Sequence, residues 1–203
     1  MNRREFMKAG GVMLAAVVLM FSSNAGHAED APQVTVLVTY HSSTGNTEKM
    51  AEGVAEGAKA VAGTSVILKR IRDVARNDLI SADAVIVGSP VYFGNMSGEV
   101  KTFFDNWSLT FDMFRERKMR NKIGGAFATG AGISSGKEVT ILTIFAAMFI
   151  NQMIVVSGGG GFGASATTGP DSPGIDDKEM AEARELGKRI AEVAALVKRG
   201  STK

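Results

Sequence analysis

The chain alternates short apolar runs with amphipathic segments over most of its length. The apolar runs are rich in β-branched residues, as buried parallel strands are, and they cover residues 34–39, 65–69, 84–89, 122–128 and 153–157. The amphipathic segments carry apolar residues at helical spacing, and they cover residues 47–62, 97–111, 136–150 and 176–197. Strands that alternate with helices predict a single α/β domain built around a parallel sheet.

The loop after the first strand has the composition of a phosphate-binding site. It consists of Ser42, Ser43, Thr44, Gly45, Asn46 and Thr47. A strand, a loop and a helix in this order place backbone N–H groups at the positive end of the helix, where an anion binds without Lys or Arg. The hydroxyls add donors, and Gly45 permits a close approach of the backbone. The alternative is an ordinary polar turn, because these residue types are common in turns.

The same loop narrows the kind of phosphate. It contains neither G-x-x-x-x-G-K-[ST] for a triphosphate nor G-x-G-x-x-G for a dinucleotide, so a terminal monophosphate fits better. Its spacing, [ST]-x-T-G-x-T, resembles the flavodoxin phosphate loop at every fixed position, and that loop binds the phosphate of FMN. The resemblance implies FMN as cofactor and a flavodoxin-like fold, a three-layer, doubly wound α/β sheet of five parallel strands in the order 2-1-3-4-5.

A second loop follows the strand 84–89 and carries two aromatic residues. The stretch from Gly88 to Phe103 resembles the loop in WrbA-like NAD(P)H:quinone oxidoreductases that wraps the isoalloxazine ring of the flavin. The resemblance assigns cofactor contacts to Pro90, Val91, Tyr92, Phe93, Gly94 and Asn95. Planar apolar side chains and accessible backbone amides suit such a ring. The alternative is a strand end with two exposed aromatic residues.

A third loop follows the strand 122–128, and the resemblance places it over the flavin and its ribityl chain. The predicted cofactor contacts are Thr129, Gly130, Ala131, Gly132, Ser135 and Gly136. Because the carboxyl ends of parallel strands meet at one edge of a sheet, the three loops are expected to converge on one crevice. In the helix that follows the second loop, Trp107 or Phe111 is a further candidate for shielding the flavin, with a place in the core as the alternative.

The first 28 residues resemble a twin-arginine export signal. Arg3 and Arg4 precede an apolar run over residues 9–21, and small residues at Gly26 and Ala28 predict cleavage after Ala28. The predicted organisation is therefore a signal peptide over residues 1–28 and an FMN-binding domain over residues 29–203. An uncleaved membrane anchor is the alternative. Both predict a periplasmic or otherwise extracytoplasmic domain, and export of folded protein suits one that already holds a cofactor.

Charge and composition exclude several functions. The leader carries a net charge of +2, equal to the formal net charge of the whole chain, so the remaining domain is close to neutral. Neutrality argues against a nucleic-acid partner, and it differs from the acidic surface of carrier flavodoxins. The chain has no Cys, and after the leader it has only His41, so no metal site is expected. His41 either tunes the charge of the phosphate site or caps the strand.

The segment 136–150 is apolar almost all round, which is unusual for a helix at the surface. A second subunit is the simplest cover, so a homo-oligomer, a dimer or a tetramer, is expected. Together these patterns predict an exported FMN-binding oxidoreductase that reduces a quinone-type small molecule, with NAD(P)H as a candidate reductant and no catalytic side chain. The alternatives are a one-electron carrier that meets a redox partner protein, and a flavin-dependent sensing module.

Overall fold

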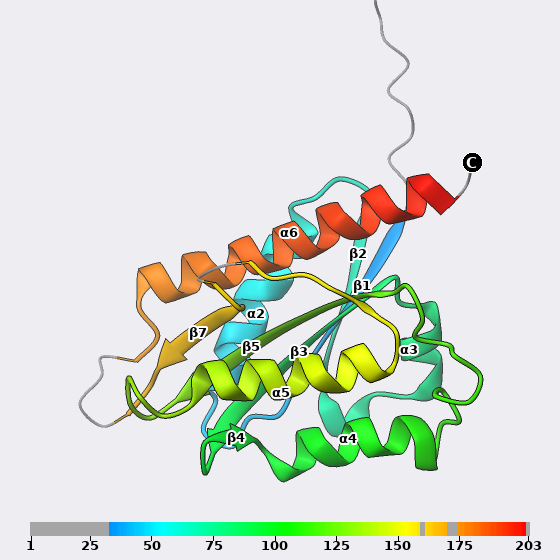
Figure 1. Cartoon of the computed structure of the whole chain (residues 1–203). Helices are drawn as coiled ribbons and strands as arrows, with labels where there is room; N and C mark the ends of the chain where they lie inside the picture. Colours follow the sequence, from blue (N-terminus) through cyan, green and yellow to red (C-terminus); the bar gives the residue numbers. More distant parts are fainter. Residues whose placement is uncertain (1–32, 159–160, 170–173, 202–203) are drawn as a thin grey trace, which may run out of the picture. The chain divides into compact units, whose positions relative to one another are not determined.

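The computed structural model describes residues 33–158, 161–169 and 174–201, which form an α/β sandwich (Figure 1). The predicted leader lies outside the described residues. The centre of the sheet consists of four parallel strands, β1 (Val34–Tyr40), β2 (Thr64–Arg70), β3 (Ala84–Tyr92) and β5 (Ile123–Gly130). Their order, β2-β1-β3-β5, agrees with the predicted order and places the point of strand reversal beside β1.

Helices cover both faces of this sheet. One face carries α2 (Asn46–Lys59) and α6 (Asp177–Ser201), and the other carries η1 (Ile71–Asp73), α3 (Arg76–Ser81), α4 (Gly98–Leu109) and α5 (Lys137–Ile150) (Figure 1). Because side chains alternate along a strand, Val36 and Val38 pack toward the first layer, whereas Leu37 packs toward the second. Burial on both faces explains why the strands are apolar throughout.

The fifth position of the sheet differs from the prediction. Instead of one strand over 153–157 there are two short strands on the same edge of β5, β6 (Ile154–Val155) and β7 (Ala164–Thr167). The segment from 164 to 167, expected as a loop, therefore belongs to the sheet. Gly163 leads into it so close to β5 that a Cβ would lie 2.1 Å from the carbonyl oxygen of Ala126. Only glycine fits there. It lets the chain pass close to β5, so that β7 can complete the sheet next to the third loop.

The second loop is a tight β-hairpin, which the sequence pattern did not predict. Strand β3 extends to Tyr92 and pairs in antiparallel fashion with β4 (Asn95–Met96). The two residues between the strands, Phe93 and Gly94, have φ angles of 51° and 76°. Positive φ at both central positions is the requirement of a type I′ turn. A hairpin therefore carries the aromatic residues at the end of β3.

Two predicted helix starts are confirmed. Ser97 Oγ accepts the Val100 N–H at 3.4 Å ahead of α4, and ahead of α6 Asp176 and Glu179 form a reciprocal capping box. Trp107 of α4 is fully buried against two phenylalanines, so it belongs to the core and does not shield a flavin. Of the helices that the structure describes, none is both long and apolar enough to cross a membrane.

Candidate functional site

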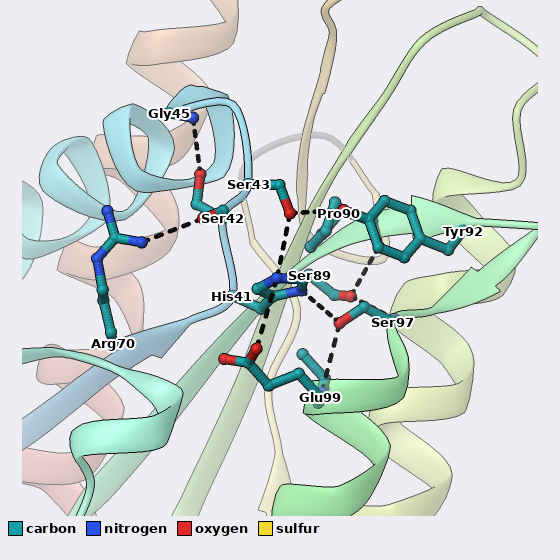
Figure 2. A network of polar contacts seen from close by, with 11 residues as sticks. His41, Ser42, Ser43, Gly45, Arg70, Ser89, Pro90, Tyr92, Ser97 and Glu99 are labelled. Carbon is teal, nitrogen blue, oxygen red and sulfur yellow. Dashed lines mark hydrogen bonds and ion pairs between the residues drawn. The ribbon is translucent and has the colours of Figure 1, made fainter.

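Hydroxyl contacts join the first loop to each of the other two. Thr47 Oγ1 at the start of α2 lies 2.8 Å from Thr129 Oγ1 near the end of β5, and both side chains are buried. Ser43 Oγ lies 2.8 Å from the phenol oxygen of Tyr92 (Figure 2). The two contacts come from opposite ends of the loop. They hold it against the carboxyl ends of β3 and β5.

The second and third loops touch through their backbones. Gly136 has a φ angle of 96°, and a Cβ there would lie 2.9 Å from Gly94 Cα. Behind it, a Cβ on Gly130 would lie 2.1 Å from Ser135 Oγ. A side chain at Gly136 would separate the two loops, and one at Gly130 would displace the Ser135 hydroxyl within the third loop. The three predicted loops therefore meet at the switch point of the sheet, as the sequence implied.

The first loop presents its backbone more freely than its hydroxyls. Ser42 Oγ accepts the Gly45 N–H at 3.1 Å, and Thr44 Oγ1 accepts from the Asn46 side-chain amide at 3.2 Å. By contrast, the backbone N–H groups of Thr44, Asn46 and Thr47 meet no acceptor within the described part of the chain. Gly45, with a φ angle of 88°, turns these groups toward the start of α2. The result is an anion cradle built from N–H groups and a helix terminus.

A partly buried brace of three side chains supports this cradle from below. The Arg70 guanidinium donates to the carbonyl oxygen of Ser42 at 3.1 Å and to Glu48 at 2.6 Å, and the Tyr40 hydroxyl donates to Glu48 at 2.5 Å. Burial and the hydrogen bond to Glu48 raise the pKa of Tyr40 to about 12. Arg70 neutralises Glu48 and fixes the first carbonyl of the loop. The brace therefore holds the cradle in shape without placing a cation inside it.

His41 is the centre of a polar network between the first two loops (Figure 2). Its Nδ1 lies 2.8 Å from Ser97 Oγ, and its Nε2 lies 3.3 Å from Ser43 Oγ and 3.7 Å from a carboxylate oxygen of Glu99. The carboxylate favours a proton on Nε2, so the Ser97 hydroxyl is the donor to Nδ1. The ring also meets Tyr92 edge-on, with centroids 5.9 Å apart. His41 is thus a link between loops rather than a simple cap of β1.

The hairpin exposes its aromatic side chains. Tyr92 is 43% exposed, and Phe93 at the tip is fully exposed. Asn95 turns to α5, where its side-chain oxygen accepts from the Thr143 hydroxyl at 2.8 Å and from the Met96 N–H at 2.7 Å. Asn95 therefore anchors the hairpin through its side-chain oxygen. The apolar surface at the hairpin tip belongs to the two aromatic rings.

Two residues assigned to the second loop belong to strand β3 instead. Pro90 pairs with Thr129 across the β3 and β5 ladder, and Val91 packs against the core beside α4 and α5. The sequence placed the strand end at Ser89, three residues early, because Pro usually ends a strand. Here β5 and β4 both pair with this part of β3. Pro90 and Val91 therefore belong to the strand that positions the hairpin, and both remain half-buried.

The third loop runs from Ala131 to Gly136 between β5 and α5. Ser135 Oγ is buried and has no hydrogen-bond partner among the described residues. Lys137, the first residue of α5, is also buried. Within the described ranges no group of three or more acidic or histidine residues is arranged to hold a metal ion.

Sequence reasoning missed four residues that shape the site: Glu48, Arg70, Glu99 and Lys137. The sequence placed Glu48 in a helix and Arg70 directly after the strand 65–69, and no local pattern predicts that they meet. Glu99 offered a weak signal, because it lies two residues after the helix cap Ser97, which faces His41. Lys137 lies at the end of the third loop and at the positive end of the next helix. A basic residue is unfavourable there, and this was a signal that it serves another purpose.

Comparison with known proteins agrees with this geometry. Residues 32–167 match the family described as NADPH-dependent FMN reductase. The chain belongs to this family. Among curated members, an NAD(P)H dehydrogenase (quinone) of Chromohalobacter salexigens is 32% identical over 197 residues, which span 79% of this chain and 96% of the relative. A flavodoxin of Aquifex aeolicus is 38% identical over 170 residues, covering 79% of this chain and 87% of the relative.

Solved structures confirm the flavodoxin-like fold. A WrbA-like flavodoxin from Agrobacterium tumefaciens superposes with a TM-score of 0.68 at 29% identity, covering 80% of this chain and 98% of the other. The family and these neighbours support FMN as the cofactor and an oxidoreductase as the class of protein. The residues present fit that cofactor: free N–H groups suit a monophosphate, and the unpaired Ser135 hydroxyl suits a polar ligand beside the third loop.

Proposed function

We propose that this protein is an FMN-dependent oxidoreductase that passes two electrons from NAD(P)H to a quinone-type acceptor. The observation that carries the proposal is the meeting of an N–H cradle, an aromatic hairpin and a glycine-rich loop at one edge of the sheet. A quinone dehydrogenase relative that aligns over nearly its whole length supports the choice of reaction. When bound, FMN supplies the hydride chemistry.

The protein's own part is to bind and to orient. The N–H groups of Thr44, Asn46 and Thr47 would hold the phosphate, and the hydroxyl contact between Thr47 and Thr129 keeps the helix end against β5. Tyr92 and Phe93 would offer flat apolar surface to the ring or to a planar acceptor. No side-chain acid or base is required for these tasks.

The purified domain tests the cofactor. We expect it to be yellow and to release FMN, not FAD, when the cofactor is identified by mass spectrometry. Steady-state assays should then show benzoquinone reduced with NADH or NADPH. A domain that takes up no FMN on reconstitution would refute the proposal.

A one-electron carrier is the second candidate, because a relative named flavodoxin aligns as well as the quinone dehydrogenases do. Anaerobic titration separates the two functions. We expect the bound flavin to take up two electrons in a single step and to oxidise NADPH or NADH. Two separate one-electron steps without nicotinamide oxidation would favour the carrier. A redox change without any acceptor activity would favour a sensing module.

We also propose export through the twin-arginine route, on the pattern of residues 1–28 alone. Replacing Arg3 and Arg4 together by Lys should leave a reporter fused after Ala28 inside the cytoplasm. Unchanged export would show that another export route recognises the leader. Uncleaved protein in the membrane fraction would favour the membrane anchor.

A homo-oligomer is the last part of the proposal. Phe145 and Met148 of α5, two of the apolar residues behind that prediction, are buried within the chain, but Val139, Leu142, Phe149 and Ile150 remain 44–66% exposed. A cavity of about 640 Å³ between α4 and α5 adjoins Ile150. We propose a second copy as the cover. Light scattering should show a dimer or larger, and Phe149→Glu should shift it toward the monomer.

A further inference from the structure

Lys137 is a buried cation with no acidic partner. Only 5% of the residue is exposed, and its ammonium group faces three neutral oxygens. These are the carbonyl oxygens of Gly132 and Ile133 at 3.1 and 3.4 Å and the hydroxyl of Thr167 at 2.7 Å. Among the described residues no carboxylate comes within ion-pair distance of it.

Glu179, which accepts from the backbone of the same Thr167, is not paired with Lys137. Both carboxylate oxygens of Glu179 accept backbone N–H groups, from Thr167 at 2.8 Å and from Asp176 at 3.1 Å. Taking an ammonium out of water costs several kcal/mol unless an anion or a full set of hydrogen bonds replaces the solvent. Lys137 also stands at the positive end of α5, which adds to that cost. The three oxygens give the ammonium hydrogen-bond acceptors but leave its positive charge unneutralised, so an anion that the site receives would gain from this charge.

The position of Lys137 indicates which anion it would attract. Its ammonium holds two carbonyls of the third loop from behind, and the next residue toward the N-terminus, Gly136, touches the hairpin backbone at Gly94. The ammonium also meets Thr167 of β7, so it lies behind the third loop and not in the phosphate cradle at the start of α2. The third loop is a predicted contact of the flavin, so Lys137 adds positive charge on the side of the site where that loop would meet the cofactor.

We propose that Lys137 sets the reduction potential of the bound FMN by favouring its two-electron-reduced, negatively charged form. The inference rests on the FMN binding proposed above. A hydride from the nicotinamide donor carries one proton and two electrons, so the donor leaves with one more positive charge and the flavin gains one negative charge. A fixed cation near the flavin binds the reduced cofactor more tightly than the oxidised one.

Three variants of the full-length, FMN-loaded protein test this role. Lys137→Gln keeps a donor for the loop carbonyls but removes the charge, Lys137→Met removes both, and Lys137→Arg keeps the charge. Lys101→Met is the matched control, because Lys101 lies on the exposed face of α4 in a surface pair with Asp105. Circular dichroism of each variant establishes that it folds.

The decisive measurement is the two-electron potential, determined by equilibration with reference dyes. For Lys137→Gln and Lys137→Met we expect reduced FMN to lose about tenfold more affinity than oxidised FMN, which lowers the potential by about 30 mV. Lys137→Arg and the control should stay near the wild type. Addition of sulfite to the oxidised flavin, which also creates a negative charge on the ring, should weaken in the same two variants.

The outcomes separate the inference from the proposal beneath it. The inference is overturned if Lys137→Gln keeps the wild-type potential and sulfite affinity, or if it lowers the affinities for oxidised and reduced FMN equally. In either case Lys137 only stabilises the loop. That result leaves FMN binding intact. If the wild-type protein takes up no FMN, the proposed function and this inference both fail.

Discussion

The phosphate loop and the aromatic hairpin are built on opposite principles. The phosphate loop is held by the Tyr40, Glu48 and Arg70 brace beneath it and by a buried hydroxyl contact at Thr47. The hairpin exposes Phe93 completely at its tip. Small anions need N–H groups that are already aimed, whereas a flat ring needs only apolar surface within reach. The braced phosphate loop, the rigid half of the site, therefore suits the permanently bound cofactor. The hairpin, the exposed half, suits substrates that bind and dissociate.

The joint between the hairpin and the third loop should be the most sensitive point. Gly136→Val places a branched side chain at a φ angle of 96° and against Gly94 Cα. We expect a loss of about 2–3 kcal/mol in the free energy of unfolding and at least a tenfold loss of FMN affinity, because the two loops must separate. Denaturant unfolding and fluorescence titration measure the two effects. Gly200→Ala near the end of α6 is the control, since a Cβ there meets nothing within 4 Å; equal losses in both variants would contradict the close contact.

The buried hydroxyl pair tests the rigid half. Thr47→Val or Thr129→Val alone leaves one buried hydroxyl unpaired, so each should cost about 1–3 kcal/mol of stability. The double variant should cost clearly less than the sum, because neither hydroxyl is then left without a partner. A thermodynamic cycle from urea unfolding measures the coupling. Strict additivity would show that the two hydroxyls do not depend on each other.

The tip of the hairpin tests the exposed half. Phe93→Ala should leave the free energy of unfolding within about 0.5 kcal/mol, because the side chain is in solvent. The KM for a quinone should rise several-fold, whereas the affinity for FMN should change less. Phe114→Ala, at a half-exposed aromatic of the segment after α4, is the control. An unchanged KM would mean that the acceptor does not use the tip.

The brace predicts a small effect at alkaline pH. Burial and Glu48 raise the pKa of Tyr40 from 10.0 to about 12, so the folded state favours the protonated phenol. The corresponding stability is present below pH 10 and is lost as the pH rises from about 10 to 12. Tyr40→Phe should flatten that part of the pH profile of unfolding. A profile that falls equally steeply in the variant would assign the alkaline loss to other groups.

The sequence alone predicted the central strands and the three loops that follow them, because these follow from local patterns. Apolar runs mark strands, Gly45 marks a turn before a helix, and parallel strands bring their carboxyl ends together. The family resemblance added the order of the strands, FMN as the molecule that carries the phosphate, and the flavin ring. Local signals also fixed the helix starts at Ser97 and Asp176.

Tertiary structure decided what no local pattern contains. Pro90 ends strands in most contexts, but here pairing on both sides carries β3 on to Tyr92. The hydroxyl of Ser43 looked like a phosphate donor, and only the fold shows that it meets Tyr92 and His41. Arg70 meets Glu48 across 22 residues of sequence, and Lys137 meets Thr167 across 30. Contacts between such distant residues depend on how the chain packs, because the free energy that fixes them is gained only when separate elements come together.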